Sequence, residues 1–225
     1  MKNSLLLSST VLFTCVVFIS AIPANAQFGG LGGLVGGGNS NSSNTMSSDD
    51  LVKNVSSLNL RFSKSMSEMM QAQSFTQSAL GNKAKADELS AKAKSLDGSN
   101  DINVISRSVS VSEDASKEID EKMASSGALD AQGKATLALA TPHYAAGMLQ
   151  AAQLPGEYTK WVSNAQAAVN GNPMAAISLG GRLKDVISVT SNLPGLVSAW
   201  STTTGNFSKF ARSNKVDTSN LASKY

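Results

Sequence analysis

The sequence is poor in the residues that build disulfide bonds and catalytic or metal centres. Its 225 residues include one cysteine, Cys15, and one histidine, His143. Cys15 lies in the N-terminal apolar run, so a mature chain without that run cannot form a disulfide. A chain of about 200 residues can bury enough apolar surface to fold without such bonds. With one histidine, a metal site would depend on carboxylates, and their spacing matches neither a zinc site nor a calcium loop.

The sequence also lacks a strong charge of either sign. Nineteen basic and 16 acidic residues give a formal net charge of +3, and removal of Lys2 with the signal peptide leaves about +2. This balance argues against a nucleic-acid partner. Aromatic residues make up only 5% of the chain, whereas alanine and serine are abundant. This composition is typical of helices that pack through small side chains.

Residues 1–26 have the pattern of a secretory signal peptide. Lys2 supplies the positive start, Leu5–Ile19 is apolar, and Ala24-Asn25-Ala26 is an A-x-A cleavage site. The alternative is an N-terminal membrane anchor, but the apolar run is shorter than the ~20 residues that a span needs. The sequence therefore predicts export through a cleaved signal, to the periplasm or outside the cell.

Residues 27–46 are rich in glycine, asparagine and serine and show no folding pattern. Glycine at the density of Phe28–Gly38 costs too much backbone entropy for a helix. The sequence therefore predicts a disordered lead before the folded domain. An alternative is that its apolar part, Phe28–Val35, contacts a membrane or a partner.

The stretch Ser48–Leu80 predicts the helix around which the remaining chain packs. Its apolar residues follow helical spacing and form one stripe: Leu51, Val55, Leu58, Phe62, Met66 and Met69. Ser47 and Asp50 form a plausible capping pair, and Gly81-Asn82 is a stop. The cluster Met46, Met66, Met69 and Met70 is predicted to be core, although methionines can also form adaptable binding surfaces. A helix with a single apolar stripe is marginal alone and needs partners.

Residues 83–96 favour a helix that either stands alone or extends the first one. The next helix is expected from Ser99 or Asp101 to about Ser126, with Ile105, Val109, Ile119 and Met123 on one stripe that Ser112 and Ser116 fill. Within residues 102–111, however, Ser108–Val111 alternates as a strand would. An isolated strand has nothing to pair with, so the helix is preferred.

Proline and glycine divide the remaining chain. Pro142 either starts a helix or kinks one, Gly171 ends a helix through Tyr158 and Trp161, and Asn172-Pro173 starts another. The apolar residues of that next helix are Met174, Ile177, Leu183, Val186 and Ile187. Leu193-Pro194-Gly195 predicts a further break before the last helix, and residues 213–225 read as a loose polar tail. The prediction is an all-α bundle of five to seven helices over residues 47–212.

No residue pattern indicates a catalytic, cofactor or metal site. His143 as a general base would need a nucleophile and an orienting acid, and we expect it and Tyr144 to bond to local backbone instead. The carboxylates, such as Glu113-Asp114, Glu118 and Asp120-Glu121, lie near lysines and are typical of a solvated helix face. The chain is therefore predicted not to be an enzyme.

Trp161 and Trp200 follow the helical spacing of their apolar neighbours, which predicts that both are buried. A buried indole prefers a partner for its N–H group. The alternative is a surface aromatic pair that grips a ligand.

These observations suggest an exported, non-enzymatic helical protein that binds an unknown protein partner or scaffolds an envelope structure. The alternative is a membrane-active helical protein, which would insert either Phe28–Val35 or the glycine-interrupted stretch Met174–Trp200 into a bilayer.

Overall fold

The computed structural model describes residues 46–222, which form six long helices, a short helix α7 and no strand. This confirms the predicted all-α bundle. The signal peptide and residues 27–45 of the predicted lead, together with residues 223–225, lie outside the described part. Within residues 46–222, no helix is both long and apolar enough to cross a bilayer. The helices are α1 Ser48–Ala79, α2 Lys83–Leu96, α3 Ile102–Ser125, α4 Ala131–Ala151, α5 Leu154–Gly171, α6 Pro173–Ser213 and α7 Ser219–Ala222.

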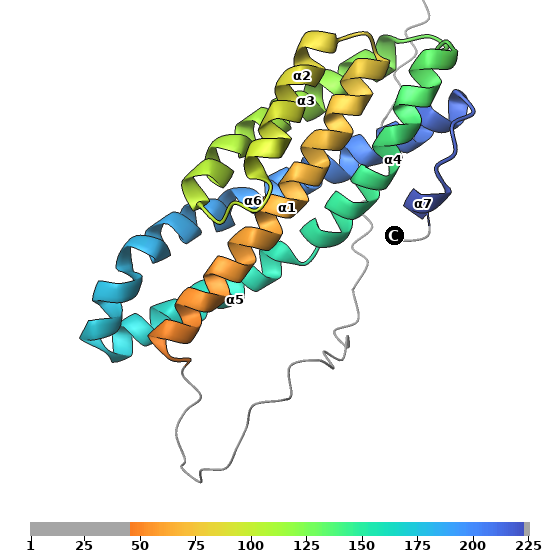
Figure 1. The fold of residues 1–225 in the computed structure, drawn as a ribbon. Coiled ribbons are helices and arrows are strands. Elements are labelled where there is room, and N and C mark those ends of the chain that lie inside the picture. The colour runs from red at the N-terminus through yellow and green to blue at the C-terminus, as the bar shows by residue number, and fades with distance from the viewer. Residues whose placement is uncertain (1–45, 223–225) are drawn as a thin grey trace, which may run out of the picture. The chain divides into compact units, whose positions relative to one another are not determined.

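Helix α1 runs through the middle of the bundle and contacts α2, α3, α4, α5 and α6 (Figure 1). Its predicted stripe is buried, and Met66, Met69 and Met70 are fully buried with it. The predicted cap is confirmed, because the Asp50 backbone N–H donates to the Ser47 hydroxyl at 3.1 Å. The helix therefore gains from its neighbours the stability that it lacks alone.

The chain turns sharply between α1 and α2. Gly81 adopts a φ of 80°, a left-handed conformation that glycine tolerates best, so α2 is a separate helix. Residues 102–111 are helical, which decides against the strand alternative. The Asp101 carboxylate caps α3 by accepting the Asn103 N–H at 2.9 Å, and Ile105, Ile119 and Met123 are buried as predicted.

The predicted break at Leu193-Pro194-Gly195 is wrong, because α6 is a single helix of 41 residues that runs through Pro194. A continuous stripe of side chains packs α6 on the bundle. The residues of this stripe recur every three or four positions on both sides of the proline. The stripe consists of Ala175, Leu179, Leu183, Val186, Val189, Leu193, Leu196, Trp200, Thr203, Phe207 and Ala211, buried except for the partly buried Leu183. Pro142 likewise lies inside a single helix, α4.

The interpretation of residues 213–225 as a loose polar tail is also wrong for the part that the structure describes. After α6 the chain turns back, and Val216 and Leu221 are 8% and 3% exposed. The Ser219 backbone N–H and hydroxyl donate to Asp217, which lowers the pKa of that carboxyl below its usual value. Leu221 lies against α4 and α6, so two apolar side chains dock a segment that is otherwise polar.

Candidate functional site

His143 projects from α4 towards α1. Its Nδ1 atom lies 2.7 Å from the Glu68 carboxylate, and its ring stacks on Phe75 at a centroid distance of 5.5 Å. Glu68 and Phe75 are seven residues apart and so lie two turns apart on one face of α1. The expectation that His143 and Tyr144 bond to local backbone is wrong, because both side chains reach α1. The Tyr144 hydroxyl instead accepts from Thr76 at 3.4 Å.

A carboxylate can orient an imidazole for catalysis, but the second ring nitrogen must then serve a nucleophile or substrate. Among residues 46–222, Glu68 is the only hydrogen-bond partner of the His143 imidazole ring. The two side chains are 33% and 27% exposed. The visible effect of this contact is to join α4 to α1.

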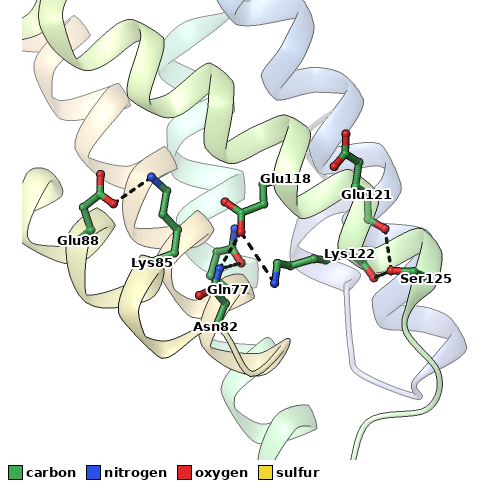
Figure 2. Close-up of polar contacts among 8 residues, drawn as sticks. All are labelled: Gln77, Asn82, Lys85, Glu88, Glu118, Glu121, Lys122 and Ser125. Carbon is green, nitrogen blue, oxygen red and sulfur yellow. Dashed lines mark hydrogen bonds and ion pairs between the residues drawn. The ribbon is translucent and has the colours of Figure 1, made fainter.

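The Glu118 carboxylate of α3 lies among two amide side chains and a lysine, as Figure 2 shows, whereas the Asp120 carboxylate accepts from the Thr203 hydroxyl of α6. Glu118 accepts from Asn82 at 2.7 Å and pairs with Lys122 at 3.8 Å, while Asn82 also donates to Gln77 at 3.2 Å. These contacts fasten the turn between α1 and α2 onto α3. In the described residues, no three His, Cys, Asp or Glu side chains gather to hold a metal ion.

The two tryptophans are buried, as predicted. The Trp161 indole N–H donates to the Leu51 carbonyl, and the Trp200 indole N–H donates to the Ser112 hydroxyl, each at 2.8 Å. Ser112 in turn donates to Gln73 at 3.1 Å, and the Gln73 amide donates to Ser116 at 2.9 Å. A satisfied polar network thus joins α1, α3 and α6 inside the core, where unpaired groups would be costly.

The most exposed large apolar side chains of the described surface lie at the start of α6. Met174 is 69% exposed and Ile177 is 78% exposed. They are three residues apart and therefore adjacent on the helix surface. Gly180 and Gly181 follow one turn later, and a Cβ on either would meet nothing within 4 Å. We call Met174, Ile177, Gly180 and Gly181 the α6 patch.

The patch contains apolar residues that do not pack in the core. Met174, Ile177 and Ile187 are among the apolar residues that the sequence offers to this helix, yet all three are exposed. The face that packs passes through Ala175, Leu179 and Val186 instead. Met174 and Ile177 lie about 100° and about 160° from Ala175 around the helix axis, so they face away from the bundle when Ala175 packs on it.

The α6 patch lies at the end of the bundle where α1 begins and α5 meets α6. A hollow of about 260 Å³ is found at the same end of the bundle, on the Ala175 side of α6, and its walls come from all three helices. Met46, the first described residue, lines this hollow and accepts a weak hydrogen bond from Asn164 of α5. Met46 therefore lies at the same end of the bundle as the α6 patch. The hollow is lined by Met46, Ser47, Ser48, Ala167, Ala168, Gly171, Asn172 and Ala175.

Comparisons with protein-family models, with curated proteins and with solved structures find no match to this chain. The candidate site therefore stands on its own geometry.

Sequence reasoning did not identify the α6 patch. The apolar residues of this helix were grouped by residue type and not by their position around the helix axis. The register of Ala175, Leu179, Val186 and Val189 was available in the sequence as a signal, because these residues recur at spacings of four, seven and three. Counting alanine as a core residue would have placed Met174 and Ile177 outside the stripe.

Proposed function

We propose that this chain is an exported, non-enzymatic helical protein that binds a protein partner of the cell envelope through the α6 patch. The observation that supports the proposal is the exposure of Met174 and Ile177, at 69% and 78%, on adjacent positions of an ordered helix. Large apolar side chains grouped on a surface are typical of interaction sites. Residues 1–26 supply the export signal, and the protein acts in the periplasm or outside the cell.

The geometry of α6 favours a partner that binds to a preformed surface. The patch lies on a helix whose opposite face is fixed by Ala175 and Leu179, which are 2% and 0% exposed. A partner would therefore meet a surface that is already ordered, and binding would cost little conformational entropy. Gly180 and Gly181 leave the helix backbone open to close approach by a partner.

A capture experiment from the native envelope tests this proposal. The mature chain, residues 27–225, serves as bait beside the double variant Met174→Lys/Ile177→Lys. A matched control, Leu139→Lys/Leu149→Lys, changes two α4 residues that are 53% and 50% exposed. We expect the same protein to be enriched by the parent and by the α4 control, and not by the α6 variant. Equal capture by all three baits, or equal loss in both variants, would contradict the proposal.

A second candidate function is membrane activity, and the same exposed side chains favour it. Met174 and Ile177 begin the stretch Met174–Trp200, which would have to leave the bundle to enter a bilayer. Leu179, Val186 and Leu193 of this stretch are buried, so insertion would expose the surface that they cover. Dye release from liposomes separates the two functions: leakage caused by the parent and abolished in Met174→Lys/Ile177→Lys would favour membrane activity over partner binding.

A further inference from the structure

A second concave surface lies away from the α6 patch, between α4, α6 and α7. It is a cleft of about 360 Å³. Helix α6 supplies one wall, with residues spaced so that they share one face, while α4 and α7 supply the apolar remainder. The cleft is lined by Met148, Ser201, Thr204, Gly205, Ser208, Arg212 and Leu221.

The polar groups of this cleft are hydrogen-bond donors without an accompanying acid. Three hydroxyls and the Arg212 guanidinium line it, and none of the lining residues is acidic. Thr204 is only 6% exposed, and its hydroxyl oxygen has no hydrogen-bond partner among the described residues. A buried hydroxyl without a partner costs free energy, so a ligand group or a water that bonded to Thr204 would be favoured.

The arginine is held at the rim of the cleft by the segment after α6. Its Nε–H donates to the Thr218 hydroxyl at 3.1 Å. No hydrogen bond or ion pair joins its two terminal nitrogens to another described residue, and these form the fork that pairs with carboxylate or phosphate oxygens. Met148 and Leu221 supply the apolar side chains that line the same cleft.

We infer that this cleft binds a small anionic amphiphile, meaning a molecule with one carboxylate or phosphate group and a short apolar chain. The anionic group pairs with Arg212 and accepts from the hydroxyls of α6, and the apolar chain lies against Met148 and Leu221. This site is independent of the proposed partner surface, because the two share no residue.

Gly205 allows a direct test of the cleft. Gly205 lines the cleft and a Cβ there would meet nothing within 4 Å, so Gly205→Leu adds a side chain at the wall of the cleft from an open position. Leucine also favours a helix more than glycine does, which helps the variant to fold. Gly195→Leu is the matched control, because Gly195 is an exposed glycine of the same helix with equally open surroundings. Thermal melts of each variant, followed by circular dichroism, verify folding.

The probes separate the charge of the ligand from its chain. Octanoate is titrated into the mature chain by calorimetry, while the methyl resonance of Met148 is followed by NMR. Acetate supplies the charge alone, octanol the chain alone, octylammonium the opposite charge, and inorganic phosphate the free anion. We expect octanoate to bind with a Kd on the order of 1 mM or tighter and to shift the Met148 resonance. Octylammonium should bind at least about tenfold more weakly, and the three remaining probes should be weaker than octanoate.

The variants locate the site. Gly205→Leu should abolish octanoate binding, Arg212→Gln should weaken it about tenfold, and Gly195→Leu should leave it unchanged. No saturable octanoate binding below about 10 mM would overturn the inference. Equal binding of octylammonium, or undiminished binding to folded Gly205→Leu, would overturn it as well.

Discussion

The middle of α1 and the N-terminal half of α6 illustrate two ways in which a helix can meet the same bundle. Around Phe62, Met66 and Met69, α1 is in contact with other helices on several sides, and these residues are fully buried. The first half of α6 buries about one residue per turn and leaves Met174, Ile177 and Ile187 exposed. The contrast shows that one region of the bundle is packed on several sides, whereas another leaves large apolar side chains exposed.

The contrast also extends to polar groups. In the α1 region, Gln73, Ser112 and Trp200 satisfy one another inside the core. At the start of α6, Asn172 caps the helix by accepting the Met174 N–H at 2.9 Å, and the side chains that follow face outward. Substitutions should therefore be costly in the first region and mild in the second.

The largest effect is expected at Trp200. Trp200→Ala would remove a fully buried indole and leave the Ser112 hydroxyl without a donor, at a cost of about 3–5 kcal/mol in the free energy of unfolding. Chemical denaturation monitored by circular dichroism measures it. Trp200→Phe loses the N–H and part of the ring volume but keeps an aromatic ring in the core, so it should cost clearly less. Equal stability of the parent and Trp200→Ala would contradict a core at this position.

Alkaline pH should destabilise the bundle through its buried tyrosines. Burial raises the pKa of the Tyr144 and Tyr158 phenols above the usual value of about 10. Above about pH 10 the unfolded chain releases these protons and the folded chain keeps them, so stability falls as pH rises. The loss is about 1.4 kcal/mol per tyrosine at about pH 11. Phenolate absorbance follows the ionisation of these tyrosines, and circular dichroism follows unfolding. Both tyrosines should ionise together with unfolding, whereas ionisation of both at their usual pKa in a folded protein would contradict their burial.

Gly147 should be intolerant of a methyl group. A Cβ there would lie 2.7 Å from the Cγ and Sδ atoms of Met69 and 3.2 Å from the Met69 backbone nitrogen. Gly147→Ala should therefore lower the free energy of unfolding by about 1–2 kcal/mol, even after the gain in helix propensity. The matched change Gly195→Ala, at an open position of α6, should raise it by about 0.4–1 kcal/mol. If both variants changed the free energy of unfolding in the same direction, the packing difference between the two regions would be contradicted.

The Glu68–His143 pair should contribute less. A double-mutant cycle with Glu68→Ala and His143→Ala should give a coupling energy of about 0.5–1 kcal/mol, because both groups are partly exposed. Lys83 and Asp87 are a control pair, 84% and 69% exposed. Their coupling energy should be near the lower end of the range for surface ion pairs. A larger coupling in the control pair would contradict the structural role assigned to His143.

The smallest effect on stability is expected in the α6 patch. Met174→Lys/Ile177→Lys should change the free energy of unfolding by no more than about 0.5 kcal/mol, because neither side chain packs on the core. Ala175→Lys, one residue away, places a charge at a position that is 2% exposed and should be strongly destabilising. If the double variant were as unstable as Ala175→Lys, the patch would be part of the core.

The sequence predicted the helices because the signals for them are local. The stripe of α1, the Ser47 cap and the Asn172-Pro173 start lie within a few residues of the helix that they define. The burial of Trp161 and Trp200 was predicted for the same reason. The hydrogen bonds that complete their environment join helices distant in sequence, and spacing alone does not reveal them.

The errors arose where tertiary packing overrides a local signal. Pro194 breaks the hydrogen-bond pattern of its own turn, yet the buried stripe on both sides holds α6 as one helix. Residues 214–221 look polar, and the docking of Val216 and Leu221 depends on surfaces of other helices. The exposure of Met174 and Ile177 followed from a register set by Ala175, whose small side chain gave little hydrophobic signal.

Native-state hydrogen exchange along α6 tests the central claim most directly, because one helix crosses both regions. Amides around Trp200 and Phe207 should exchange only through opening that approaches global unfolding, since these side chains are fully buried. Amides around Ile177 and Gly181 should exchange through local opening at a much lower free energy. Uniform protection along all 41 residues would contradict the division between a packed core and a loosely packed end of α6 with exposed apolar side chains.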